Sequence, residues 1–327
     1  MNAGQDARFM AAAIALAGRG RARTTPNPNV GCILVNEGRV VGRGWTQPGG
    51  RPHAEAMALA EAGEAARGST AFTSLEPCAH QSLRGPACTN GLIAAGVTRV
   101  VSAALDPDIR TNGQGFERLA AGGIAVESGP MASEARAVMA GWWSRETRGR
   151  PFVTLKLATS LDGCIALANG ESRWITGEAA RAHGHLERAR ANMIVVGRGT
   201  LEADSPRLDV RLPGLEDRSP RRGLLTSGSA PDGWETLASP EAIKDFEGVD
   251  WILVEGGAAT AASFLKAGLV DRLLLYRAPI TIGGGRSSLG DIGLDRMGDA
   301  HGQWHRTDTR QLGSDTLDIY VRADKEG

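Results

Sequence analysis

The chain has 327 residues, of which 42% are hydrophobic and 23% are charged. This length and composition are typical of a globular protein, and they allow two hydrophobic cores, so we expect two domains. Lysine plus arginine and aspartate plus glutamate number 37 each, and the net charge is therefore zero. Zero net charge excludes the overall positive field that attracts nucleic acid, and it favours a small-molecule substrate.

The first apolar run, residues 11–16, is too short to span a bilayer and is flanked by Arg8, Arg19 and Arg21. We therefore expect a helix over 5–18 rather than a signal segment, and no membrane partner. Two of the four cysteines are assigned to a metal below. The other two, Cys32 and Cys164, are expected to be buried thiols in a reducing compartment, which indicates the cytoplasm.

Strands and helices are predicted to alternate along the first half of the chain, which favours a layered α/β domain. The turn at 36–38 is predicted to pair the first two strands. The predicted strands cover 30–35, 39–44, 71–74, 99–104 and 124–127, and the predicted helices cover 5–18, 53–66, 87–95 and 115–121.

A charged stretch with glycine and proline, residues 144–151, is predicted to separate this half from a second one. We expect domains at 1–147 and 148–327. The second half contains predicted strands over 152–158, 193–196 and 251–255. The last two run into glycines, and a helix is predicted over 258–267. Strand, glycine and helix in this order suit a phosphate group, although a glycine there is often only a turn. No Gly-x-Gly-x-x-Gly fingerprint or Walker loop occurs, which argues against a classical Rossmann domain.

The most informative motif is His53-Ala54-Glu55, followed by Pro77-Cys78 and Cys88. One imidazole and two thiolates can hold zinc and leave a fourth position open for water, whose pKa the metal lowers to about 7. We expect His53, Cys78 and Cys88 to be the ligands. Glu55 is expected to stay off the metal as the general acid/base that moves protons during hydrolytic deamination.

Proline lies directly before two of these ligands, at Pro52 and Pro77, which predicts that His53 and Cys78 each begin a helix. A helix N-terminus stabilises a thiolate, so Cys78 is expected to benefit most. Taken singly, His53 could be a surface histidine and Cys78 a small buried side chain. A structural zinc site remains an alternative, but such a site wants four protein ligands and no spare glutamate.

Several motifs in both halves resemble the bifunctional deaminase/reductase of riboflavin biosynthesis. They are Thr25–Gly31, His53–Glu55, Leu75–Cys78, Lys156–Gly163 and Gly170–Gly177. The resemblance implies an N-terminal, three-layer cytidine-deaminase-like domain and a C-terminal dihydrofolate-reductase-like domain, both α/β. It implies zinc-dependent deamination of a diaminopyrimidinone that carries a phosphoribosylamino group, followed by NADPH reduction of its ribosyl group to ribityl.

In the deaminase half the resemblance implies that Asn27, His80 and Arg84 contact the substrate. Thr46 stands where the family has a histidine, and the loop from Cys78 to Cys88 is one residue longer than usual. Asn27 could instead shape only a turn, and His80 could only cap a helix.

In the reductase half the resemblance implies two sets of binding residues and no catalytic base. The substrate set is Ser172, Arg188, Leu208, Arg211 and Glu255. The NADPH set is Ala158, Trp174, Thr200, Asp204 and Ser227, with Gly257, Ala258, Ala259, Thr260, Ala261, Ala262 and Ser263 at its phosphates. Two arginines suit a sugar phosphate, since guanidinium groups bind phosphate oxygens in pairs.

Two departures from the family pattern are visible in this half. A single acidic residue, Asp204, lies before Pro206 where the family has two, and the region from Ser227 to Trp251 is shorter. The alternatives are a deaminase whose reductase half is inactive or diverged, and a nucleic-acid-editing deaminase or zinc-binding module. A nucleic-acid-editing deaminase would need a basic surface or stacking aromatic side chains. This chain has zero net charge and only 5% aromatic residues, which disfavours that alternative. We expect a homo-oligomer, a dimer or tetramer, without nucleic-acid or membrane partners.

Overall fold

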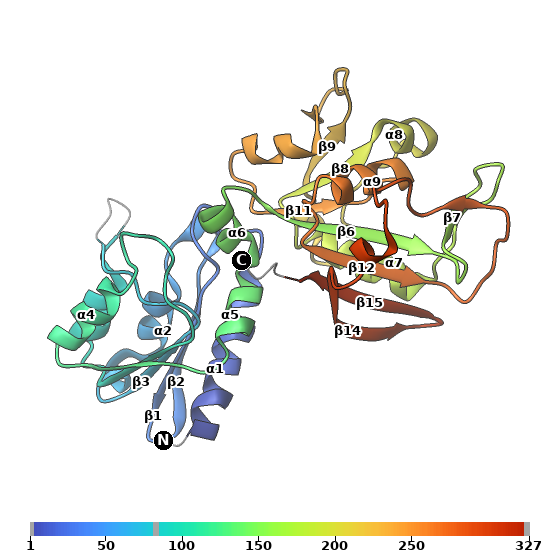
Figure 1. The fold of residues 1–327 in the computed structure, drawn as a ribbon. Coiled ribbons are helices and arrows are strands. Elements are labelled where there is room, and N and C mark those ends of the chain that lie inside the picture. Colours follow the sequence, from blue (N-terminus) through green and yellow to red (C-terminus); the bar gives the residue numbers. More distant parts are fainter. Residues whose placement is uncertain (1–2, 81–84, 324–327) are drawn as a thin grey trace. The chain divides into compact units, whose positions relative to one another are not determined.

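The computed structural model describes residues 3–80 and 85–323 (Figure 1). The chain divides into two compact units, Met1–Arg150 and Pro151–Gly327. The stretch from Ser144, predicted to separate the halves, is helical up to Arg148, and Gly149 ends that helix in a left-handed conformation at φ 65°. Its arginine and glutamate residues favour a helix as readily as a linker, and glycine commonly terminates one.

Unit 1 contains five strands and six α-helices in the described ranges. The strands are β1 (Gly31–Asn36), β2 (Arg39–Trp45), β3 (Thr70–Thr73), β4 (Arg99–Ser102) and β5 (Ala125–Ser128). The helices are α1 (Ala3–Ala17), α2 (Ala54–Ala62), α3 (Cys88–Ala94), α4 (Gln114–Ala121), α5 (Ala132–Val138) and α6 (Ala140–Arg148). The predicted strands and helices of the first half are confirmed within a few residues, whereas α5 and α6 were not predicted.

The sheet of unit 1 has the order β2-β1-β3-β4-β5, with β1 antiparallel to both neighbours and the remaining pairs parallel. A Cβ atom on Gly31 would lie 1.9 Å from the Ala13 carbonyl oxygen of α1, and one on Gly44 would lie 2.0 Å from that of Ala54 in α2. Gly44 pairs with Cys32, the residue after Gly31, and successive strand residues face opposite sides. Helices α1 and α2 therefore cover opposite faces, which makes the unit three-layered.

Unit 2 is built on a larger sheet with the order β10-β9-β8-β11-β6-β12-β15-β14. Its strands are β6 (Phe152–Thr159), β8 (Met193–Gly197), β9 (Arg221–Leu225), β10 (Glu235–Leu237), β11 (Trp251–Val254), β12 (Arg272–Arg277), β14 (Trp304–Leu312) and β15 (Asp315–Arg322). Strands β7 (Cys164–Ala166) and β13 (Arg286–Ser287) form a small second sheet, and the helices are α7 (Glu178–Arg188), α8 (Arg198–Asp204) and α9 (Ala258–Lys266).

Six strands of the large sheet, from β10 to β12, run parallel, and β15 and β14 extend the sheet in antiparallel fashion. The apolar strands β6, β8 and β11 are central and buried, as their apolar sequences predict. The carboxyl ends of parallel strands meet at one edge of a sheet, which is where ligands bind in open α/β folds. Among the described helices of both units, none is long and apolar enough to cross a bilayer.

Candidate active sites

His53 caps the N-terminus of α2, as the preceding proline predicts. Its backbone is extended, at φ −70° and ψ 163°, and the helix begins at Ala54. Glu55 lies in the first turn of α2 and is 3% exposed. Because His53 precedes the regular helix, the side chains of His53 and Glu55 are not held to opposite helix faces.

The two cysteines enter the site differently from the prediction. Residues 75–80 form no helix, so the prediction that Cys78 begins one is wrong: proline permits a helix start but does not produce one without the following turn. Cys88 instead is the first residue of α3, after the N-cap Ala87. The backbone N–H of Cys88 donates a hydrogen bond to Cys78 Sγ at 3.4 Å. The N-terminus of α3 thus provides Cys78 with a hydrogen-bond donor, although Cys78 itself lies outside a helix.

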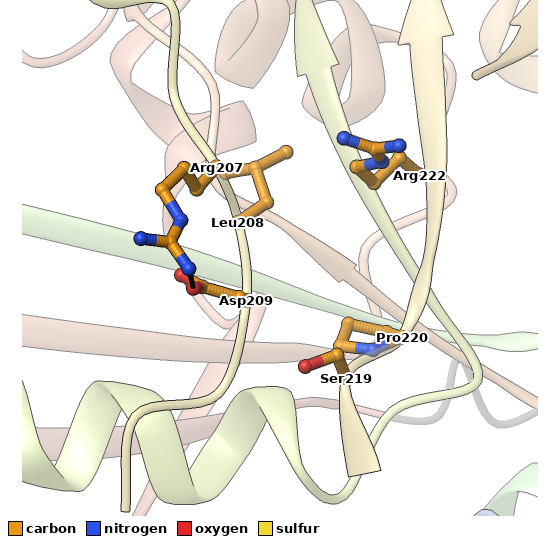
Figure 2. Close-up of a pocket in the computed structure, with 6 residues that line it drawn as sticks. All are labelled: Arg207, Leu208, Asp209, Ser219, Pro220 and Arg222. Carbon is orange, nitrogen blue, oxygen red and sulfur yellow. Dashed lines mark ion pairs between the residues drawn. The ribbon is translucent and has the colours of Figure 1, made fainter. Parts of the chain in front are cut away.

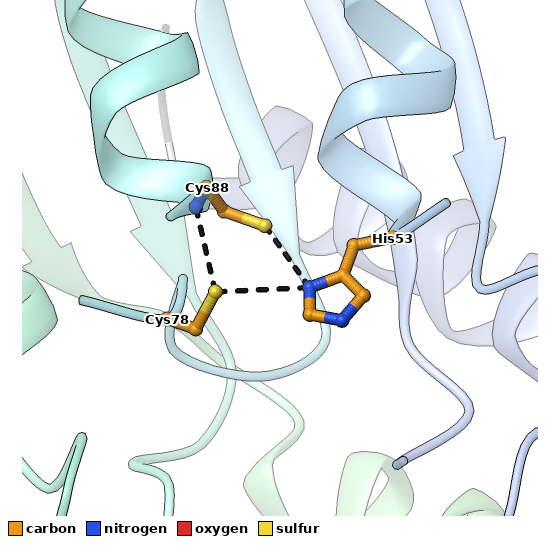
Figure 3. Close-up of side chains that lie close together, drawn as sticks. All are labelled: His53, Cys78 and Cys88. Carbon is orange, nitrogen blue, oxygen red and sulfur yellow. Dashed lines mark hydrogen bonds between the residues drawn. The ribbon is translucent and has the colours of Figure 1, made fainter. Parts of the chain in front are cut away.

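The three predicted ligand atoms converge (Figure 3). His53 Nδ1 lies 3.2 Å from Cys88 Sγ and 3.7 Å from Cys78 Sγ, and all three donors lie within 4.8 Å of one another. A tetrahedral ion with Zn–S bonds of about 2.3 Å and Zn–N bonds of about 2.0 Å separates its ligand atoms by about 3.5 Å. One nitrogen and two sulfurs at these distances fit zinc with a fourth position left open.

The local environment shifts the pKa values of Cys78, Cys88 and Glu55 in different directions. The pKa of Cys78 is lowered to about 4, chiefly by its hydrogen bond with the Cys88 side chain and also by His53. The pKa of Cys88 is raised, first by the same hydrogen bond and then by burial. Burial is also the main reason that the pKa of Glu55 is raised above its usual range. A carboxyl group with a raised pKa can both accept and return a proton near neutral pH.

A cavity of about 370 Å³ is lined by His53, Cys78 and Glu55, and Asn27 and His80 line it as well. The Asn27 side-chain nitrogen lies 2.9 Å from His53 Nε2 and donates to the Gly50 carbonyl at 2.9 Å. His80 Nδ1 lies 3.4 Å from the Thr111 hydroxyl, which belongs to the loop between β4 and α4. Thr46 also lines the cavity, but its hydroxyl accepts a hydrogen bond from the Val30 N–H. Arg84, predicted to contact substrate, lies outside the described residues.

A structural carboxylate beside the cavity escaped the sequence analysis. Glu76 is 3% exposed, and its two oxygens accept backbone N–H bonds from Asp106, Gly113, Gly115 and Phe116 at 2.8–3.3 Å. These bonds fix the loop between β4 and α4, whose residues Asp106, Asp108 and Arg110 line the cavity. Burial raises the pKa of Asp106 to about 7. Glu76 belongs to the Glu-Pro-Cys motif, but its role could not be predicted from that motif. Its hydrogen bonds go to backbone groups about 30 to 40 residues away along the chain.

In unit 2 the predicted substrate residues Arg188 and Glu255 form a paired ion bridge at the carboxyl edge of the sheet. Arg188 Nε and Nη2 donate to the two Glu255 oxygens at 2.8 and 2.9 Å. Lys156 Nζ, on β6, lies 3.7 Å from Glu255 Oε2. Burial alone would raise the pKa of Glu255, but Lys156 and Arg188 outweigh it and lower the pKa to about 2. Lys156 belongs to a motif quoted above but was not singled out.

The other predicted substrate residues lie in loops near this pair. The side chain of Arg211 is 56% exposed, and its Nε lies 3.5 Å from Asp209 Oδ1. Its backbone N–H lies 3.3 Å from Nδ1 of His185, a residue of α7 that the sequence analysis did not select. Leu208 is buried and lines a cavity of about 360 Å³ together with the Arg207–Asp209 ion pair (Figure 2). Ser172 is half-buried in the loop before α7.

The predicted phosphate-binding segment begins at the N-terminus of α9. Gly257 is its N-cap and makes no side-chain cap, and the Gly257 N–H donates to the Thr200 hydroxyl at 3.2 Å. Ala258 and Ala259 follow in the first turn. Thr260 packs so closely that a Cβ atom on Gly197 would lie 2.2 Å from its hydroxyl. Ala261 and Ala262 are buried, and the Ser263 hydroxyl donates to the Thr260 carbonyl, so an anion can meet only the first turn of this segment.

The remaining predicted cofactor residues lie near the ends of β6, β9 and α8 and in the loop before α7. Ala158 is half-buried near the end of β6, and Ser227 is exposed just after β9. Trp174 is 65% exposed, and the Arg181 guanidinium lies 4.8 Å from its ring centre. Asp204 ends α8, and Arg173 donates to its carbonyl at 3.1 Å. An exposed indole, a helix start and nearby hydroxyls are compatible with an extended dinucleotide.

Two family models together match most of the chain. The cytidine and deoxycytidylate deaminase zinc-binding region matches residues 3–104, which include the three ligands and Glu55. The RibD C-terminal domain matches residues 151–232 and 241–317. The gap between these two ranges falls in the shortened region noted above. A match on both sides of the gap gives no support to the alternative of a lost reductase half.

Whole-length relatives agree with the family models. The riboflavin biosynthesis protein RibD of Escherichia coli is 38% identical over 95% of this chain and 98% of that protein. The structure of Acinetobacter baumannii RibD superimposes with a TM-score of 0.88 at 33% identity, covering 99% of this chain and 100% of that one. A Thermotoga maritima structure, described as a diaminohydroxyphosphoribosylaminopyrimidine deaminase/5-amino-6-(5-phosphoribosylamino)uracil reductase, superimposes at 0.86 with 28% identity, covering 98% of this chain and 99% of that one. This chain, with a zinc-type ligand cluster in one unit and a reductase-type fold in the other, belongs to the RibD family of riboflavin-biosynthesis proteins.

Proposed function

We propose that this chain catalyses two consecutive steps of riboflavin biosynthesis. Unit 1 hydrolyses an amino group from 2,5-diamino-6-(5-phosphoribosylamino)pyrimidin-4-one, and unit 2 uses NADPH to reduce the ribosyl group of the product to ribityl. The observation that carries the proposal is the convergence of His53, Cys78 and Cys88 beside a buried glutamate that is not one of the three clustered donors. The names of the whole-length relatives support the choice of substrate.

In the deaminase, His53, Cys78 and Cys88 are the proposed zinc ligands. Bound zinc supplies a water molecule acidified enough to attack at neutral pH. Glu55 takes a proton from the attacking water and delivers a proton to the departing amine, so that water is consumed, the C–N bond breaks and ammonia leaves. Asn27 and His80 line the cavity and are proposed to hold the pyrimidine, and Arg84 is a further proposed contact.

In the reductase, the proposed contacts divide between two ligands. NADPH supplies the hydride when it is bound. Its phosphates are proposed to meet the first turn of α9 from Gly257, beside Thr200, with Trp174, Asp204, Ser227 and Ala158 along the remainder. The substrate is proposed to contact Ser172, Arg188, Leu208, Arg211 and Glu255. The role of these residues is to hold the sugar carbon and the nicotinamide in reacting geometry, which requires no protein nucleophile.

A coupled assay tests both halves. Purified protein is supplied with zinc, the diaminopyrimidinone phosphate and NADPH, and ammonia release and NADPH absorbance are followed separately. We expect ammonia without NADPH, and NADPH oxidation only after deamination. Stoichiometric zinc without ammonia release would favour a structural zinc site, and ammonia without NADPH oxidation would favour a deaminase with a diverged reductase half.

The proposed assembly is a homo-oligomer, a dimer or tetramer, in the cytoplasm. Strand β14 is an edge strand with mostly exposed residues, and an unpaired edge can pair with another copy. All four cysteines are free and buried, as expected of a reducing compartment. Light scattering on the purified protein measures the mass, and a mass of about 34 kDa would contradict the oligomer.

A further inference from the structure

We propose that Arg51 binds the phosphate group of the substrate in the deaminase cavity and sets the preference for a phosphorylated pyrimidine. The inference rests on the deaminase function proposed above, because it assigns the phosphate of that substrate to one side chain. Arg51 lies two residues before His53, is half-buried and lines the same cavity as the zinc-ligand cluster.

The two other arginines that line the cavity are each paired with a neighbouring carboxylate. Arg110 forms a close ion pair with Asp108. Arg145 pairs with Glu146 at 3.0 Å and also donates to the Pro26 carbonyl at 2.6 Å. The carboxylate of Glu76 is fully engaged by backbone N–H groups. Arg110 and Arg145 therefore have little positive charge left over for a substrate anion.

Arg51 differs from these arginines. Among the described residues it has no acidic partner within ion-pair distance, although five acidic side chains line the same cavity. A half-buried guanidinium has lost part of its hydration and gains most from an anion that enters beside it. Its planar fork of N–H donors matches two phosphate oxygens, which a lysine or histidine cannot reproduce.

The position of the Arg51 head group is restricted by the backbone next to it. A Cβ atom on Gly85 would lie 2.7 Å from Arg51 Nη1, so the guanidinium lies directly against Gly85. Gly85 precedes the ligand Cys88 by three residues, and Arg51 precedes the ligand His53 by two. The guanidinium therefore lies between the two segments that lead into the metal cluster, and it lines the cavity next to them.

The test compares Arg51→Ala with the wild type on two substrates, the phosphorylated pyrimidine and the same compound after phosphatase treatment. We expect the KM for the phosphorylated substrate to rise about 10- to 100-fold with kcat within about threefold, because one charge-assisted pair is lost. Turnover of the dephosphorylated compound should be unchanged. Arg51→Lys should fall between wild type and Arg51→Ala, since it keeps the charge without the fork.

The matched control is Arg43→Ala, an equal charge change on β2 at a side chain that is 63% exposed and paired with Glu61. It should leave both substrates unaffected. Zinc content and the thermal unfolding midpoint are measured for every variant, so that misfolding is separated from lost binding. An unchanged KM in Arg51→Ala, or an equal loss on both substrates in a folded, zinc-loaded variant, overturns the inference.

Calorimetric binding of ribose 5-phosphate tests Arg51 without turnover. We expect one binding event of the wild type to weaken at least tenfold in Arg51→Ala, and identical isotherms would count against the role of Arg51. If wild-type protein bound this probe through Arg51 but released no ammonia from the pyrimidine, the proposed function would fail while the phosphate contact stood. If the wild type and Arg51→Ala released ammonia from the phosphorylated pyrimidine with the same KM, the phosphate contact would fail while the proposed function stood.

Discussion

Glu76 Oε1 accepts a hydrogen bond from the backbone N–H of Gly115 at 2.8 Å, and this contact joins the segment before the proposed metal ligand Cys78 to the first turn of α4. A Cβ atom at Gly115 would lie 2.2 Å from the Pro77 carbonyl oxygen, so the helix start approaches the Pro77–Cys78 segment as closely as glycine allows. The loop that supplies Asp106 to the cavity is thereby tied to the ligand Cys78.

We expect Glu76→Gln to lower the free energy of unfolding by about 3 kcal/mol, because an amide NH₂ would face buried backbone donors that now have an ionised acceptor. Urea unfolding measures the change, and deamination should fall with it even at saturating zinc. Glu61→Gln is the control, since Glu61 lies on the surface of α2 beside Arg43. Similar stability of Glu76→Gln and the control would contradict the anchoring role.

Glu55→Gln should keep zinc and lose deamination by about 10²- to 10⁴-fold, because metal binding and proton transfer use different side chains. Atomic absorption gives the zinc content, and ammonia release gives the rate. NADPH oxidation with the deaminated compound serves as an internal control, because that reaction is assigned to the other unit. Unchanged ammonia release in a zinc-loaded variant would sink the assignment of Glu55.

Gly44→Ala should destabilise unit 1 by about 3 kcal/mol, since the new methyl group would overlap the Ala54 carbonyl oxygen at 2.0 Å. Relief of the overlap must move the start of α2, so zinc affinity and deamination should fall as well. Gly184→Ala in α7 is the matched control, because a Cβ atom there meets nothing within 4 Å and alanine favours a helix by about 1 kcal/mol. Equal midpoints of thermal unfolding for the two variants would argue against close packing at Gly44.

The stability of unit 2 should depend on acid through Glu255. Its pKa in the folded protein is about 2, below the usual 4.5, so the ionised form stabilises the fold. That stabilisation is complete above pH 4.5 and is lost as the pH falls toward 2. We expect Glu255→Gln to destabilise the unit by about 3 kcal/mol at pH 7, because Arg188 loses its buried partner. Unfolding of both proteins between pH 7 and 2.5 should show the difference shrinking, and a constant difference would contradict the mechanism.

Local patterns were enough to predict the metal cluster and the central strands. The ligands and Glu55 fall in short motifs whose residue types have few other uses together. Strands β8 and β11 are continuous apolar runs, and β6 is mostly apolar. Strand β14 was not predicted because its sequence is polar and its residues are mostly exposed at a sheet edge. The helix start assigned to Cys78 was wrong because the helix belongs to Cys88, a choice that depends on the intervening loop.

Contacts between distant segments could not be predicted from local patterns in the sequence. Glu76 meets Gly115, and Lys156 meets Glu255, only after the sheets have formed. That Arg51 has no acidic partner among the described residues depends on which acidic groups other arginines have already engaged. The spacing of residues along the chain does not predict which arginine pairs with which carboxylate, because that choice depends on side-chain packing in three dimensions.

Each of the two units has its own main sheet and its own hydrophobic clusters. A mutation that disables one catalytic half can therefore leave the other half working. Two defective copies of the gene, one damaged in each half, should then restore growth without riboflavin when they are expressed in the same cell. One gene therefore encodes both catalytic steps, but a mutation can remove one step without the other.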